Sequence, residues 1–144
     1  MRRDTLTKQA TIPNMDEMLQ FISTRLQKLK VSDEELNYFV LAAEELIVNI
    51  ISYGYKEKKP GNITLELEIN EAENKVILRI IDDGMQFNIL TVKPPNLNDT
   101  EHNLSKGGFG IHLVKSFTDK LEYEWKNMRN HAILHKEFTI KSQK

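Results

Sequence analysis

Three short segments of the chain carry residues whose types and spacing suit chemistry. The first is residues 45–49, in which the carboxylate of Glu45 and the carboxamide of Asn49 lie four positions apart. On a helix, residues at this spacing share a face, so both side chains can reach one ligand or one metal. Asn49 offers the hard oxygen that Mg²⁺ prefers, and Glu45 can accept a proton from an attacking hydroxyl. A solvated polar helix face is the alternative interpretation.

The second segment, residues 82–87, begins where a predicted strand ends. Asp82 and Asp83 send carboxylates out of the sheet at the point where the backbone must turn. Such a carboxylate can accept a hydrogen bond from an amino donor such as the exocyclic amine of adenine. Gly84 permits either an unusual backbone conformation or the close approach of a ligand. An ordinary Asp-Gly turn is the competing interpretation.

The third segment is a glycine cluster that opens a predicted helix, and it consists of Lys106, Gly107, Gly108, Phe109 and Gly110. Backbone N–H groups at a helix N-terminus, with roughly half a positive charge, favour bound phosphate. The lysine adds a mobile cation that can reach a terminal phosphate. The spacing is not that of a P-loop. A helix start without a ligand remains the alternative.

Between the second and third segments lies a long polar stretch, residues 88–106, which contains Pro94 and Pro95. A loop of this length inside a compact domain is typically a lid or a disordered segment. Because it lies between two proposed ligand segments, we predict a nucleotide lid.

The whole chain sets limits on function. Its 144 residues predict a single domain spanning 1–144. A net charge of −1 gives no broad attraction for nucleic acid or for an anionic membrane. The absence of cysteine excludes thiolate metal sites and cysteine nucleophiles. No apolar run approaches the length of a membrane span and the N-terminus is polar, so a cytoplasmic location is expected.

The apolar patterns predict the elements that must position these segments. Helical spacing predicts helices at residues 15–29, where Asn14 is expected as the cap, and at 32–54, where Ser32 and Glu35 form a capping box. Alternation predicts strands at 63–69 and 121–125. Each is followed by a turn and a second strand, at 76–81 and, after a turn at 127–130, at 132–140, so two hairpins are expected. A strand at 5–12 precedes them, and a helix follows Gly110. The expected fold class is α+β, a two-layer sandwich with a mixed, mostly antiparallel sheet and helices on one face.

The three segments, in this order, resemble the motifs of GHKL-type ATP-binding domains, the Bergerat fold shared by DNA gyrase B, MutL and histidine kinases. Residues 45–55 resemble the N-box, 82–87 the adenine-binding box and 107–114 the glycine box. The resemblance covers nearly the whole chain. In length and motif style it is nearest to the bacterial anti-sigma-factor serine/threonine kinases of the RsbW and SpoIIAB type.

The resemblance implies roles for the residues of the three segments. Asn49 would be the Mg²⁺ ligand and Glu45 the general base. Asp82 would accept from the adenine amine, with Gly84 making room for the base. The remaining cofactor-binding residues implied for ATP are Phe87, Lys106, Gly107, Gly108, Phe109 and Gly110.

The resemblance also implies partners. Such proteins bind ATP and Mg²⁺, form homodimers, sequester a sigma factor and phosphorylate a STAS-domain anti-anti-sigma protein. A catalytically silent, nucleotide-gated binding module of the same fold is the alternative. A histidine kinase catalytic domain fits less well because no phosphoacceptor hairpin precedes the motifs, and a gyrase-like machine would be longer.

Three positions depart from the pattern of these relatives. Tyr53 stands where histidine is frequent, which is expected to alter a contact near the adenine. Gln86 replaces a glycine or proline. The segment 130–134 lacks the Gly-Thr pair that larger relatives place before the final strand. None of the three removes a proposed catalytic group.

Overall fold

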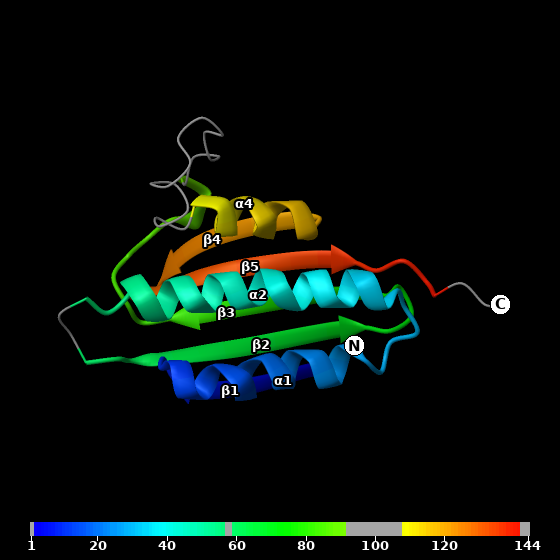
Figure 1. Cartoon of the computed structure of the whole chain (residues 1–144), viewed down its shortest axis with the longest axis horizontal. Coiled ribbons are helices and arrows are strands. Elements are labelled where there is room, and N and C mark those ends of the chain that lie inside the picture. Colours follow the sequence, from blue (N-terminus) through cyan, green and yellow to red (C-terminus); the bar gives the residue numbers. More distant parts are fainter. Residues whose placement is uncertain (1, 57–58, 92–107, 142–144) are drawn as a thin grey trace.

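A computed structural model describes residues 2–56, 59–91 and 108–141 of the chain. Its strands are β1 (Arg2–Gln9), β2 (Asn62–Asn70), β3 (Lys75–Asp82), β4 (Lys120–Lys126) and β5 (Arg129–Glu137). Its helices are α1 (Met15–Leu26), α2 (Asp33–Tyr53) and α4 (Gly108–Phe117), with single 3₁₀ turns η1 (Ile12–Asn14) and η2 (Ile89–Thr91). The helices lie together over one face of the sheet, with α2 between α1 and α4 (Figure 1).

The five strands form one sheet in the order β1-β2-β3-β5-β4. Both predicted hairpins are confirmed, and the α+β sandwich with helices on one face is confirmed as well. Among the described strands every pairing is antiparallel, so the parallel pairing of a mixed sheet is not found there. The first strand begins earlier than predicted because it pairs along the whole of β2, from Arg2 opposite Ile69 to Gln9 opposite Asn62.

The core lies between the helices and the helix-facing side of the sheet. The alternation that predicted β2 holds, since Ile63, Leu65, Leu67 and Ile69 are all buried. These side chains lie on one face of the strand because successive residues point to opposite faces. The largest fully buried side chains of the core include Phe39, Met18, Ile22, Leu26, Leu46, Ile47, Leu78, Ile80 and Leu134.

The two predicted helix starts differ in detail from the expectation. Asn14 precedes α1 but its side chain does not cap the helix; its Nδ2 donates to the Gln9 carbonyl oxygen instead. Ser32 does cap α2, because its Oγ accepts from the Glu35 backbone N–H at 3.4 Å. The second half of the capping box is replaced, since the Glu35 carboxylate accepts from the backbone N–H and hydroxyl of Thr139.

The turn between β4 and β5 is shorter than predicted. Asn127 and Met128 have positive φ values of 54° and 59°, which form a tight two-residue hairpin connection. Strand β5 therefore begins at Arg129, and Asn130 lies within the strand rather than in the turn. This correction changes the composition of the candidate site.

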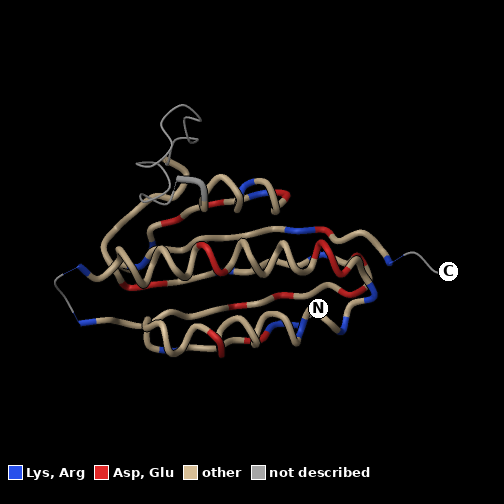
Figure 2. The backbone as a smooth tube through the Cα atoms, in the orientation of Figure 1, with Lys and Arg blue, Asp and Glu red and all other residues tan. Residues whose placement is uncertain are grey.

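Helix α2 is long and apolar enough, by length and composition alone, to cross a membrane. Its apolar face is the core face, however, with Leu36, Phe39 and Ile47 buried against the rest of the fold. A central core helix meets the same criterion. Acidic and basic residues both occur over the described elements, in keeping with the small net charge, although the charged residues of α2 are all acidic (Figure 2).

Candidate functional site

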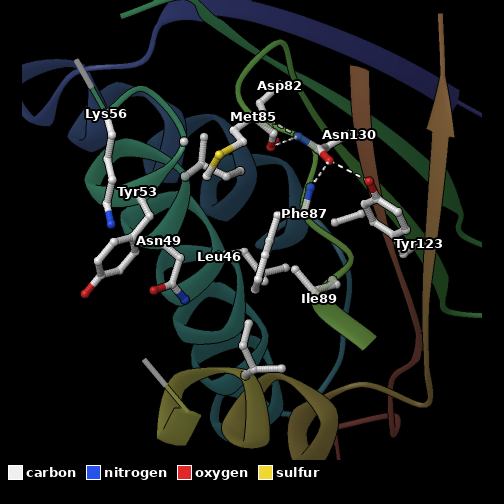
Figure 3. A pocket seen from close by; sticks show the side chains of 14 residues that line it. Leu46, Asn49, Tyr53, Lys56, Asp82, Met85, Phe87, Ile89, Tyr123 and Asn130 are labelled. Atoms are coloured by element: carbon white, nitrogen blue, oxygen red, sulfur yellow. Dashed lines mark hydrogen bonds between the residues drawn. The ribbon is translucent and has the colours of Figure 1, made fainter. Parts of the chain in front are cut away.

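A pocket of about 340 Å³ opens between the C-terminal half of α2, the segment after β3, and the elements α4, β4 and β5. This volume lies in the usual range for small-molecule sites. Figure 3 shows Asp82 and Asn130 at one side of the pocket and Asn49 and Tyr53, on α2, at the other. Its apolar wall is formed by Leu46, Ile50, Met85, Phe87, Ile89, Ile111 and Ala132.

Asp82 is the buried acidic group of this pocket, with 5% of its surface exposed. Its Oδ1 accepts from the Gly84 backbone N–H at 2.9 Å and from Asn130 Nδ2 at 3.0 Å. Burial raises the pKa of the Asp82 carboxyl above its ordinary value, while these two hydrogen bonds act in the opposite direction. The predicted location of the carboxylate at the end of the strand is therefore seen in the structure.

Asn130 is a site residue that the sequence analysis missed. Its Nδ2 also donates to the Met85 carbonyl at 2.9 Å, and its Oδ1 accepts from the Phe87 N–H at 2.9 Å and from the Tyr123 hydroxyl at 2.6 Å. The sequence contains no local signal for this role, because Asn130 meets Asp82 only through the pairing of β5 with β3. Knowledge of that register would have been needed to find it.

Gly84 is required by close packing rather than by an unusual backbone. Its φ lies outside the left-handed region, and a Cβ on it would stand 2.7 Å from the Gly54 carbonyl oxygen and 3.0 Å from Asp82 Oδ1. The Met85 N–H donates to the same Gly54 carbonyl at 2.8 Å. Of the two predicted reasons for this glycine, an unusual backbone conformation is not seen. The group that lies close to Gly84 is the carbonyl of Gly54, which directly follows α2, so the predicted approach of a ligand stays a prediction.

The polar face of α2 meets the start of α4. A Cβ on Gly110 would lie 2.5 Å from Glu45 Oε2 and 3.7 Å from Asn49 Nδ2. The first and third segments of the sequence are thus brought together, and Asn49 faces the same pocket as Asp82. Gly108 and Phe109 are the first two residues of α4, and the Phe109 side chain lies outside the described part of the structure. Lys106 and Gly107 lie outside the described residues.

Phe87, although half exposed, lines the pocket. Most of the proposed lid, from residue 92 to residue 106, lies outside the described residues. Its first part is described: Ile89 begins the turn η2 and is buried in the pocket wall. Tyr53 also lines the pocket, with Lys56 Nζ 5.6 Å from the centre of its ring. The departure from histidine at position 53 therefore falls in the site.

Asp83 has a structural role beside the pocket. Its Oδ1 accepts from the Tyr55 hydroxyl at 2.7 Å and from the Asn62 N–H at 3.1 Å. Burial is the main cause that raises the pKa of the Tyr55 hydroxyl, and the hydrogen bond to Asp83 is the second. These contacts tie the segment after α2 to β2 and to the end of β3. Tyr55 directly follows Gly54, whose carbonyl lies against Gly84.

The polar groups of this pocket suit a bound nucleotide better than a metal ion held by protein side chains alone. Within the described ranges, no three acidic or histidine side chains come together as a metal cluster. A Mg²⁺ ion at Asn49 would thus need further oxygen ligands, which triphosphates and water supply. The apolar wall suits a base, and the buried Asp82 suits its amino group.

Known proteins resemble the chain in sequence. The anti-sigma F factor of Clostridium beijerinckii is 26% identical over 122 residues, 84% of each chain. The serine/threonine-protein kinase BtrW of Bordetella bronchiseptica is 25% identical over 133 residues, 92% of each chain. The serine-protein kinase RsbW of Listeria innocua is 29% identical over 99 residues, 65% of this chain and 62% of that one.

The fold is also similar to a solved structure, that of the RsbU and RsbW domains of Rv1364c from Mycobacterium tuberculosis. The TM-score is 0.68 at 13% identity, over 99% of this chain and 35% of the other. At this identity the likeness concerns the fold. The family described as "Histidine kinase-like ATPase domain" matches residues 9–136, nearly the whole chain. This protein belongs to the histidine kinase-like ATPase domain family.

Proposed function

We propose that this protein is an ATP-dependent serine/threonine protein kinase that phosphorylates a STAS-domain antagonist in a partner-switching circuit. The names of its relatives support this proposal, since they are anti-sigma factors and serine or serine/threonine kinases. The observation that carries it is the juxtaposition of Glu45 and Asn49 with Gly110, at a pocket whose other side is Asp82.

The two sides of the pocket would take the two ends of the nucleotide. Asp82 would accept from the amino group of the base, and Gly84, whose backbone N–H donates to Asp82 Oδ1, would stand beside that base. Phe87 and its apolar neighbours would contact the ring. The amino-terminal N–H groups of α4, at Gly108 and Gly110, would donate to phosphate oxygens. We assign Lys106 and Gly107, which precede α4, and Phe109, which lies between the two glycines, to the same phosphate end.

Phosphoryl transfer depends mainly on positioning and on neutralising charge. Bound Mg²⁺ would supply that neutralisation, with Asn49 as its protein ligand. Glu45 would accept the proton of the serine or threonine hydroxyl of the substrate, or orient that hydroxyl. Its carboxylate lies against the start of α4, where the terminal phosphate would be held. No other acidic side chain is assigned to this step.

We further propose that the protein acts in the cytoplasm as a homodimer with a lid at residues 88–106, and that its second partner is a sigma factor. These proposals rest on the resemblance to the RsbW and SpoIIAB type and on the names of the relatives.

The decisive experiment is transfer of labelled phosphate from ATP to STAS-domain proteins of the same organism. The Glu45→Gln variant should bind ATP with nearly wild-type affinity in calorimetry but lose transfer by 100-fold or more, the usual range for a general base. Glu44→Gln is the matched control, because it makes the same change one position along the same helix.

Three outcomes separate the possibilities. Transfer that Glu45→Gln abolishes and Glu44→Gln preserves supports the kinase proposal. ATP binding without transfer to any STAS-domain protein favours the silent, nucleotide-gated regulator. A wild-type protein that binds no ATP overturns both.

A further inference from the structure

We propose that Asn130 is a positioning residue that directs the Asp82 carboxylate toward a 6-amino purine, so that it sets the preference of this site for adenine. The proposal rests on the proposed function, because it concerns the same nucleotide pocket. It arises from the hydrogen-bond directions at Asn130, which two of its neighbours determine without ambiguity.

The orientation of the Asn130 amide follows from those two neighbours. The Phe87 backbone N–H can only donate, so the atom 2.9 Å away must be the oxygen of the amide. The Met85 carbonyl can only accept, so the atom 2.9 Å from it must be the nitrogen. The amide nitrogen is therefore the atom that faces Asp82, at 3.0 Å from Oδ1. The Tyr123 hydroxyl then donates to the amide oxygen at 2.6 Å.

This arrangement gives the two carboxylate oxygens of Asp82 different hydrogen-bond partners. Oδ1 accepts from both Gly84 and Asn130 and so is committed to the protein. The described part of the chain has no fully buried side-chain oxygen without a hydrogen-bond partner. Oδ2, for which no partner is found there, is therefore not fully buried, and Asp82 itself lines the pocket. Oδ2 is the acceptor that remains for a ligand.

The chemistry of that acceptor selects the base. A carboxylate oxygen held as an acceptor is complementary to the 6-amino group of adenine and opposes the 6-oxo group of guanine or hypoxanthine. Asn130 favours the ionised form of Asp82 because its amide nitrogen donates to that form. Within the described residues, the charged or titratable groups near Asp82 or lining the same pocket are Asp83 next to it, Lys56 after α2, and the hydroxyls of Tyr53, Tyr55 and Tyr123.

The Asn130→Asp variant replaces the amide nitrogen, a hydrogen-bond donor, with a carboxylate oxygen, an acceptor, and hardly changes the shape of the side chain. Its side chain can still accept from Phe87 and Tyr123, but it places a second carboxylate about 3 Å from Asp82 Oδ1. Two carboxylates at this distance share a proton, so Asp82 becomes a poorer acceptor at neutral pH. The effect should diminish as the pH rises and the shared proton is lost.

The measurement is the ratio of the affinity for ATP to that for purine riboside triphosphate, which lacks the 6-amino group. Titration of the phosphates affects both ligands alike and cancels in this ratio. A hydrogen bond to a charged acceptor predicts a wild-type ratio of about tenfold or more, constant between about pH 7 and 9. For Asn130→Asp we expect a ratio at least fivefold lower at neutral pH that rises with pH.

Two further variants keep the test informative. Asn130→Ala removes the donor without adding charge, so it should lower the ratio even if Asn130→Asp does not fold. Asn127→Asp makes the same substitution in the exposed β4–β5 turn and should leave the ratio unchanged.

A folded Asn130→Asp or Asn130→Ala protein that keeps the wild-type ratio overturns the proposal. A ratio that is lowered equally at every pH in Asn130→Asp also overturns it, because it indicates a general structural defect. If the wild-type protein binds ATP and transfers phosphate, and only the Asn130 result is negative, the proposed function stands and this inference alone fails.

Discussion

Replacing Gly110 with alanine tests whether the contact between α4 and α2 places the Glu45 carboxylate. The added methyl group would stand 2.5 Å from Glu45 Oε2, whereas ordinary contact begins at 3.4 Å. The carboxylate must therefore withdraw by about 0.9 Å. Misplacement of a reacting group by 1 Å can lower a rate by roughly 100-fold, so we expect a fall in kcat of about that size.

The same substitution should cost little stability. The atom that the methyl group meets is the end of a flexible side chain, and Gly110 does not have a left-handed backbone. Alanine is also favoured over glycine within a helix by up to about 1 kcal/mol. These two effects oppose each other, so the melting temperature of Gly110→Ala should stay within roughly 4 °C of wild type.

Gly84→Ala is the matched comparison, because it adds the same atom against a rigid neighbour. There the methyl group would meet the Gly54 backbone carbonyl at 2.7 Å, which cannot move without disturbing the end of α2. Overpacking of this kind costs about 1–3 kcal/mol. Differential scanning fluorimetry and the phosphotransfer assay, applied to both variants, should thus show lost activity in Gly110→Ala and lost stability in Gly84→Ala.

A folded Gly110→Ala protein that transfers phosphate at the wild-type rate would refute the reasoning, because it would show that the position of Glu45 at this contact is unimportant for catalysis. Equal melting temperatures for Gly84→Ala and wild type would refute the claim that Gly84 is required for packing.

Three further predictions concern the pocket and its support. Asp82→Asn should weaken ATP binding at least tenfold in calorimetry. Because burial raises the pKa of Asp82 in the folded state, the stability that this carboxyl contributes to the wild-type protein is lost as the pH rises through that pKa. The difference in melting temperature between wild type and Asp82→Asn should therefore shrink or reverse at higher pH. Asn49→Ala should bind ATP equally well with Mg²⁺ and with a chelator, and retained Mg²⁺ dependence would exclude Asn49 as the ligand. Tyr55→Phe removes the 2.7 Å hydrogen bond to Asp83 and should lower stability by about 1 kcal/mol, with the stabilisation by ATP preserved.

The elements of this fold were largely predictable, because apolar side chains alternate in β2, form a nearly continuous run in β3 and recur at helical spacing in α2. Asp82, Gly84, Glu45 and Asn49 were predictable as candidates, since each belongs to a local motif. The role of Asn130 was not, for a physical reason. Asn130 reaches Asp82, 48 positions away, only through the pairing of β5 with β3. In addition, the tight turn at Asn127 and Met128, two non-glycine residues with positive φ, determines that Asn130 lies within β5.

The same logic explains the helix caps. Ser32 was predictable because its contact with Glu35 is local. The second bond of the capping box is lost because Thr139, 104 positions away, offers the Glu35 carboxylate two donors. Local patterns indicate which groups can bond. Tertiary contacts decide which of them do.

The pairing of β3 with β5 has a consequence for how the protein holds together. One wall of the pocket, formed by α2 and the end of β3, precedes residue 92, whereas α4, β4 and β5 all follow it. Contacts between these two halves form only after a long segment has closed, which carries an entropic cost. A ligand that touches both halves stabilises only those states in which they are joined. Nucleotide should therefore slow hydrogen exchange along β5 even at amides distant from the pocket. Bound ATP would thus help to keep the two halves of the fold together.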